Sequence, residues 1–150
     1  PFQPPLGYSF FLWNAKERIL ERFGNPISES SSQYAARTSD EQLWSTELVY
    51  SGITFVIGES EDRRRTWLES VDIRGKEHQL AYGLRVGSPR SDVVYAFRDS
   101  HYIEYDGGIR FGAEVWEARD EVTLEAAMEL RIDVDNDGLV TRLVIESSEL

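Results

Sequence analysis

Residues Asp133 to Gly138 form the run in this chain that is closest to a metal-binding loop. The run reads Asp-Val-Asp-Asn-Asp-Gly, which is how calcium loops of the D-x-D-x-D-G type begin. Such a loop needs a bidentate glutamate at its twelfth position, where this chain has Val144. Asn, Asp and Gly also tolerate the positive φ of a tight turn between two strands. The run therefore predicts a hairpin turn, with weak calcium binding kept as an alternative.

His78 and His101 are the only histidines, and neither belongs to a recognisable catalytic pattern. On a strand, Glu104 would lie on the opposite face from His101, so a metal or acid–base site would need ligands that no spacing predicts. The sequence has no G-x-S-x-G elbow and no glycine loop with the lysine that phosphate binding requires. We therefore predict no catalytic, cofactor-binding or metal-binding residue, and a protein that is not an enzyme.

Three consecutive arginines, Arg63 to Arg65, follow the acidic run Glu59 to Asp62. The pattern places both runs at the tip of a hairpin. The arginines could dock an acidic partner, or they could form a solvated turn that is neutralised by its acidic neighbours. We favour the solvated turn and keep the docking role as the alternative.

Aromatic residues are abundant, with four Trp, seven Tyr and seven Phe. Part of this supply is expected in the core, but exposed Tyr and Trp rings are the residues that dominate protein-binding surfaces. Strand residues alternate between the two faces of a sheet, so only some of the strand-borne rings can share one face. The candidate partner-binding residues are Trp44, Tyr50, Trp67, Tyr105 and Trp116.

Length and charge narrow the classes of partner. A chain of 150 residues is expected to form one domain, 1–150, with a continuous core. The net charge of −11 repels phosphate backbones, which argues against nucleic acid and favours another protein, especially a basic one. No run is long enough to predict a membrane span, and the absence of Cys excludes disulfides. The first residue is Pro rather than Met, as after removal of a signal peptide or an expression tag.

Two short helices are expected to position these residues. Asn14, followed by Glu17, is a capping-box pattern that predicts a helix over 14–23. Ser88 predicts the cap of a second helix that runs to Phe97. Each helix has one apolar stripe, which we expect to pack on one side of a sheet. The stripe residues are Ile19, Leu20, Phe23, Val93, Val94 and Phe97.

Antiparallel strands are expected to make up most of the rest, with tight turns at Ser51-Gly52 and Gly107-Gly108. Residues 27–42 are polar and serine-rich, and they predict a loop with a short strand at 33–37. The remaining strands are expected over 43–50, 53–58, 66–74, 101–105, 109–119, 122–134 and 139–147.

The same unit is present twice in the sequence. Residues 10–26 and 84–100 align without a gap, which pairs Leu20 with Val94 and Phe23 with Phe97. Further along, Tyr50 to Phe55 is echoed by Tyr105 to Phe111, and Val71 to Ile73 by Leu143 to Ile145. A recurring group of this kind is typical of a duplicated supersecondary unit. We therefore predict an α+β fold with two tandem helix-plus-antiparallel-strand repeats, about 10–74 and 84–148, that form one curved antiparallel sheet with helices on one face.

The chain resembles the tandem-repeat domains of β-lactamase-inhibitor-protein-like folds and the related small bacterial outer-membrane assembly lipoproteins. The residues that carry the resemblance are Ile19 to Pro26 in the first unit and Val86 to Val93 in the second. Arg98 stands where a helix-ending glycine would be expected, and the inhibitor's usual cysteines are absent. The resemblance implies a concave sheet face that grips a protein, and it favours the bacterial cell envelope or secretion over the cytoplasm.

Two functional hypotheses follow. The first is a non-enzymatic protein-binding module of the inhibitor, immunity or envelope-assembly type, which uses an aromatic sheet face. The second is a small-molecule-binding or catalytic domain of the cone-shaped helix-plus-curved-sheet type. That domain would need a closed pocket on which groups such as Tyr, His101 and a carboxylate converge.

Overall fold

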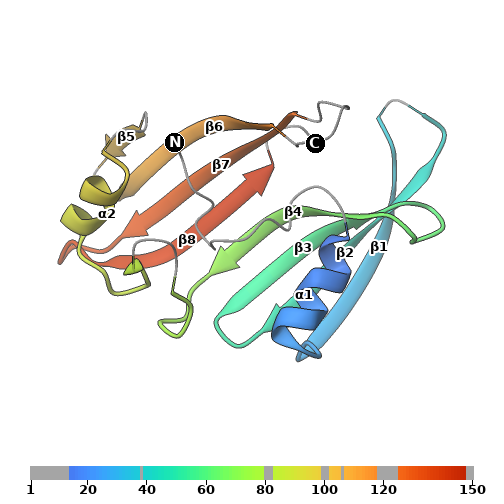
Figure 1. Cartoon of the computed structure of the whole chain (residues 1–150), viewed down its shortest axis with the longest axis horizontal. Helices are drawn as coiled ribbons and strands as arrows, with labels where there is room; N and C mark the ends of the chain where they lie inside the picture. The colour runs from blue at the N-terminus through green and yellow to red at the C-terminus, as the bar shows by residue number, and fades with distance from the viewer. Residues whose placement is uncertain are drawn as a thin grey trace.

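One antiparallel sheet of eight strands and two helices make up the described part of the chain, which is an α+β fold (Figure 1). The computed structural model describes residues 14–37, 39–79, 83–98, 102–105, 107–117 and 125–147. Along the sheet the strands follow the order β1-β2-β3-β4-β8-β7-β6-β5. The elements in chain order are α1 (Ala15–Phe23), β1 (Ser28–Ala35), β2 (Gln42–Tyr50), β3 (Ile53–Glu59), β4 (Thr66–Ile73), α2 (Arg90–Ala96), β5 (Tyr102–Tyr105), β6 (Gly108–Glu117), β7 (Glu125–Val134) and β8 (Val140–Ser147).

Each helix is followed by four strands, and the two groups meet where β4 pairs with β8. In that pairing Val71 lies opposite Ile145, and Ile73 lies opposite Leu143. The two tripeptides that echo one another in the sequence are therefore direct neighbours in the sheet. The segments that begin at Tyr50 and Tyr105 also resemble one another in sequence, but they differ in position. Tyr50 ends the second strand after α1, whereas Tyr105 ends the first strand after α2. Those two tyrosines do not occupy equivalent places in chain order.

The hairpin turns lie where the turn residues predict them. Ser51 and Gly52 join β2 to β3, and Gly52 has the positive φ of 75° that such a turn requires. The run from Asp133 to Gly138 also turns the chain, between β7 and β8. There the Asp135 carboxylate accepts the backbone N–H groups of Asp137 and Leu139, at 2.9 and 3.0 Å. A carboxylate that accepts backbone donors in this way stabilises the turn itself.

Both helices lie within their predicted segments, and Asn14 holds the N-cap position of α1, but neither predicted side-chain capping bond forms. Asn14 has left-handed backbone angles and makes no side-chain capping bond. The Thr66 hydroxyl of β4 accepts the backbone N–H of Lys16 instead, at 3.1 Å. Ser88 does not cap α2 either, because its hydroxyl accepts the N–H of Arg85 and the helix begins only at Arg90. At the start of α2 the backbone N–H of Arg90 donates to the carbonyl oxygen of Gly138 at 2.8 Å, so long-range contacts hold both helix starts.

The segment after α1 also differs from its prediction. Residues 28–35 form a full strand, β1, where a loop with a short strand at 33–37 was expected. All eight residues pair with β2 without a register shift, from Ser28 opposite Val49 to Ala35 opposite Gln42. Its serines have weak strand propensity and no apolar alternation, so backbone pairing with β2 is what makes this segment a strand.

The core lies on the sheet face that α1 contacts. Phe23 of α1 lies 5.1 Å from Phe55 of β3 and 5.5 Å from Tyr50 of β2, measured between ring centroids. The same buried cluster includes Val93 and Phe97 from the α2 region. The sheet residues of the cluster are Leu48, Ile53, Phe55, Ile57, Leu68, Val71, Ile73, Ile109, Leu130, Ile132, Val140, Leu143 and Ile145. Neither described helix is long and apolar enough to cross a membrane.

Candidate functional site

The two faces of the sheet can be separated from the strand registers, because directly opposite residues point to the same side. Phe55, Val71 and Ile145 lie opposite one another in turn and share the side that carries Phe23 of α1, which we call the helix face. The neighbouring positions point the other way. They include Asp72 and Val144, and we call their side the open face.

Trp44 and Tyr50 lie on the helix face. Tyr50 is half-buried against Phe23, and its hydroxyl donates to the carbonyl oxygen of Gly24 at 2.7 Å. Trp44 is also half-buried, and the guanidinium of Arg63 lies 3.7 Å from the centre of its ring. Cation–π stacking therefore holds part of the predicted arginine tip, while Arg65 approaches Glu41 at 4.0 Å. Arg63 to Arg65 are all exposed.

Trp67 and Tyr105 lie on the open face, but β8, β7 and β6 separate their strands. Trp67 is directly opposite Gly58, and its ring occupies the space that a side chain at Gly58 would need. Tyr105 is exposed at the β5 edge. Trp116 belongs to β6, and its side chain lies outside the described residues. The described part of the sheet therefore places two candidate rings on each face, and it does not bring the two on the open face together.

The two histidines are not joined in a described site. The His78 ring lies 6.1 Å from Phe23, and its Nε2 is 2.7 Å from the carbonyl oxygen of Ser51. His101 lies outside the described residues. Across the part of the chain that is described, no group of three or more His, Asp or Glu residues is arranged to hold a metal ion.

A buried carboxylate that the sequence analysis missed lies on the open face beside Trp67. Glu69 of β4 is only 8% exposed. The hydroxyls of Tyr34 and Ser45 donate to its two oxygens, at 3.1 and 3.4 Å. Burial raises the pKa of Glu69, although these hydrogen bonds and one from Trp67 act in the opposite direction. Burial and the nearby Glu69 charge raise the pKa of Tyr34 to about 12.

One row of residues crosses five strands of the open face. Asp72, Val144, Arg131, Arg110 and Ile103 are successive direct neighbours on β4, β8, β7, β6 and β5. The two arginines thus lie side by side. Like charges in direct opposition destabilise a sheet unless anions lie nearby. Arg131 has such an anion, because its Nε is 3.4 Å from the Asp133 carboxylate.

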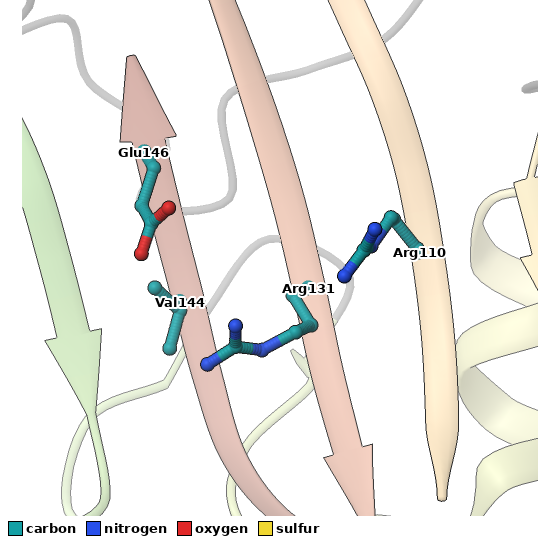
Figure 2. A pocket seen from close by; sticks show the side chains of 4 residues that line it. All are labelled: Arg110, Arg131, Val144 and Glu146. Carbon is teal, nitrogen blue, oxygen red and sulfur yellow. The ribbon is translucent and has the colours of Figure 1, made fainter. Parts of the chain in front are cut away.

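A shallow hollow interrupts this row. It is lined by Arg110, Arg131, Val144 and Glu146, and we call it the arginine hollow (Figure 2). The Arg131 side chain extends toward Val144, which is only 4% exposed although it points to the open face. Arginine stems cover apolar surface in this way and keep the charged group accessible. The cavity volume is about 100 Å³, far below the ~300–1,000 Å³ of sites that enclose small molecules.

An ion pair joins the two halves of the sheet on the same face. Nε and Nη2 of Arg142 donate to the two oxygens of Asp72, at 3.0 and 2.7 Å. Burial raises the pKa of Asp72, but the hydrogen bonds and charge of Arg142, with Arg74 at 3.5 Å, lower it by more. The net effect holds the pKa of Asp72 below its ordinary value.

Another buried carboxylate, Glu59, lies on the helix face. It is 1% exposed, and the Thr46 hydroxyl donates to it at 2.7 Å. The ammonium group of Lys16 lies 3.7 Å from Glu59 and 3.0 Å from Glu29. This network connects α1 to three strands. It holds the helix on the sheet and has no access to a cavity that the structure describes.

The positions of the arginines on the open face could have been predicted from the sequence. Arg110, Arg131 and Arg142 each stand next to buried aliphatic residues in a strand, so alternation places all of them on the face away from the core. No comparable sequence pattern predicts that the carboxylates of Glu59 and Glu69 are buried.

No protein-family model, curated protein or solved structure matches this chain.

Proposed function

We propose that this protein is a non-enzymatic protein-binding module whose contact surface is the open face of the sheet. The observation that carries the proposal is the row from Asp72 to Ile103. It is a continuous strip of charged and apolar side chains across five strands, on the side of the sheet opposite α1. Arg110 and Ile103 are exposed, Asp72 and Arg131 are partly exposed, and Val144 is buried among them. A strip of this form suits a second protein surface, because it offers many contacts and no enclosure.

The arginine hollow is the proposed polar anchor of this surface. Arginine is enriched at interfaces because its planar guanidinium binds carboxylates with two hydrogen bonds. An acidic side chain of the partner would enter the hollow and bind Arg110 and Arg131. At longer range the net charge of −11 would speed encounter with a partner that is basic overall, so added salt would weaken the complex.

Apolar contacts would come from residues at the two ends of the row. Ile103 is 69% exposed and Tyr105 is 39% exposed, so both side chains are accessible to a partner. Trp67 adds a half-exposed ring on β4, the strand at the other end of the row. Of the aromatic residues predicted to bind a partner, Trp67 and Tyr105 fit this surface. Trp44 and Tyr50 would act through the helix face.

We further propose that the chain is a tandem repeat related to β-lactamase-inhibitor-protein-like domains, with both helices on one face. Support comes from the order of elements, a helix and four strands followed by the same again, and from the strand order, which mirrors itself about the β4–β8 pair. Bacterial proteins of this type act in the envelope or outside the cell, which is the proposed location.

The proposal is tested by affinity capture with matched surface variants. Ile103→Asp and Arg131→Glu change the open face, whereas Tyr95→Ser removes an equally exposed ring, 70% exposed, from α2. A partner that binds wild type and Tyr95→Ser should bind both open-face variants at least about 30-fold more weakly by calorimetry, as expected for contacts worth ~2 kcal/mol. Equal affinity for all four proteins would place the binding surface elsewhere.

A further inference from the structure

The two edges of the sheet are built differently. β5 has only four residues, and Arg90 of α2 binds along it. The Arg90 guanidinium donates to Glu104 Oε1 at 3.1 Å and to the carbonyl oxygen of Tyr105 at 2.7 Å. β1 has eight residues, and among the described parts of the chain only β2 pairs with it (Figure 1). One edge is short and covered, and the other is long and open.

β1 also lacks the features by which proteins protect an open edge. Such edges are usually interrupted by Pro or a bulge, or carry lysines that repel another strand. β1 has the sequence Ser-Glu-Ser-Ser-Ser-Gln-Tyr-Ala and pairs with β2 in unbroken register. Its single charge, Glu29, is paired with Lys16 at 3.0 Å, and Lys16 also lies 3.7 Å from the buried Glu59. In a chain with net charge −11, this edge strand carries only one carboxylate, so two copies can approach one another here with little charge repulsion.

The hydrogen bonds of β1 show which backbone groups point outward. Ala36 donates its N–H to Glu41 on the β2 side, and hydrogen-bonded positions alternate along an antiparallel pair. The backbone N–H and C=O groups of the even-numbered residues of β1 therefore point toward β2. The two-residue turn between Tyr50 and Ile53 leads to the same result. It makes these two residues a hydrogen-bonded pair, so the even-numbered residues of β2 bond to β3 and its odd-numbered residues bond to β1. The N–H and C=O groups that point away from the sheet belong to Glu29, Ser31, Gln33 and Ala35.

We propose that β1 pairs with β1 of a second copy of this chain, antiparallel about a twofold axis at Ser32. Only the odd-numbered residues of each β1 strand have outward backbone groups, so each hydrogen-bonded pair must join two odd-numbered residues. Centring the pair on Ser32 places Glu29 opposite Ala35 and Ser31 opposite Gln33. This register uses every outward N–H and C=O group of both strands and brings no like charges together. It also brings Ile27, 74% exposed, beside the Ala35 end of the second strand. The result is one continuous sheet across two chains.

Single cysteines test the register directly, because the chain has no cysteine of its own. At Ser32 the two copies would form a non-hydrogen-bonded pair with Cα atoms about 4.5 Å apart, which suits a disulfide. Under mild oxidation Ser32→Cys should become a covalent dimer. Ser30→Cys points to the same face but lies opposite Tyr34, so it should remain uncrosslinked. Failure of Ser32→Cys to crosslink, or equal crosslinking of both variants, would overturn the proposal.

Sedimentation equilibrium tests the interface without a covalent bond. Gln33→Pro removes an outward N–H and leaves the bonds to β2 intact, a place where edge strands tolerate proline. It should raise the dimer dissociation constant by about tenfold or more, whereas Gln33→Thr keeps the N–H and should leave it unchanged. Circular dichroism identifies a variant that has failed to fold. A wild-type protein that stays monomeric up to millimolar concentration would overturn the proposal, and this outcome would not affect the proposed role of the open face.

Discussion

The hydroxyl of Tyr34 donates a hydrogen bond to Glu69, at 3.1 Å, although β2 and β3 lie between their strands. Three strand spacings of a flat sheet would cover about 14 Å, which is more than two side chains can bridge comfortably. The sheet must therefore curl toward the open face at this end. This curvature makes the open face concave beside Trp67, and it explains how a glutamate on the side away from the core becomes buried.

Replacing Glu69 with Gln should change stability in a pH-dependent way. The folded-state pKa of Glu69 is raised, so its contribution to stability is complete below the unfolded value of about 4.5 and is lost as pH rises through the folded value. Gln cannot ionise. Glu69→Gln should therefore cost about 1 kcal/mol of unfolding free energy at pH 4 and clearly less, or nothing, at pH 8. Urea denaturation at both pH values measures the difference, and a cost that grows with pH would contradict it.

Tyr34→Phe is the matched control for that experiment. The Tyr34 hydroxyl lowers the pKa of Glu69, so its removal should raise that pKa further and move the pH dependence to higher pH. Tyr34 itself, with a pKa of about 12, stays neutral throughout this range. Titration of the Glu69 side-chain carbon signal by NMR in the wild-type and variant proteins follows the change.

The ion pair between Asp72 and Arg142 should couple the two halves of the sheet. Both side chains are about one-third exposed or less, so solvent screening is only partial, and a double-mutant cycle with Asp72→Asn and Arg142→Gln should give a coupling of about 1 kcal/mol at pH 7. The pKa of Asp72 is lowered, so the coupling should be complete above about pH 4 and disappear as pH falls through the folded value. A coupling that grows as the pH falls from 7 would contradict this account.

The sequence predicts most of the elements because their signals are local. Tight turns at Gly52 and Gly138 and apolar alternation on β3, β4 and β8 set strand ends to within one or two residues. β1 could not be predicted in this way, since a serine-rich strand is defined by its pairing with β2. The contact that holds the start of α1 could not be predicted from local sequence either, because Thr66 lies more than forty residues from that helix.

The candidate site was less predictable than the fold. Alternation can place Arg110 and Arg131 on the face away from the core, but their direct opposition depends on the β6–β7 register. The contact between Tyr34 and Glu69 depends on the curvature of the whole sheet. Trp67, Tyr105 and Tyr50 are all predicted to bind a partner because they lie on strands, yet Tyr50 packs against Phe23. Residue type and periodicity do not distinguish those two environments.

Truncation of the helix-side phenylalanines should show that the core is continuous. Phe97 is only 4% exposed, so Phe97→Ala should cost about 3–5 kcal/mol, the usual range for a buried Phe. Phe23 is only partly buried against Phe55 and Tyr50, so Phe23→Ala should cost less. Thermal and urea denaturation measure both values. A loss below about 1 kcal/mol at Phe97 would show that this end of the cluster is not tightly packed.

Arg90 should hold the β5 edge in place. Its guanidinium donates to the carbonyl oxygens of Tyr105 and Gly108 and to the Glu104 carboxylate. Arg90→Gln should therefore reduce hydrogen-exchange protection in β5 and the start of β6 and leave β1 to β4 unchanged. Arg85→Gln is a suitable control, because Arg85 is also exposed and its guanidinium contacts Gln79 rather than the sheet edge. Uniform loss of protection across all strands would show that Arg90 acts on global stability instead.

The last prediction concerns the close contact of Gly58 and Trp67 on the open face. A Cβ at Gly58 would overlap the indole ring, which is hydrogen-bonded to the buried Glu69. Gly58→Ala should therefore destabilise the protein by about 1–3 kcal/mol, as overpacking does. In a Trp67→Val background the same substitution should cost almost nothing, since the smaller side chain leaves room for the methyl group. Denaturation of the four proteins closes this cycle, and equal costs of Gly58→Ala in both backgrounds would show that backbone effects, rather than the ring, require glycine at this position.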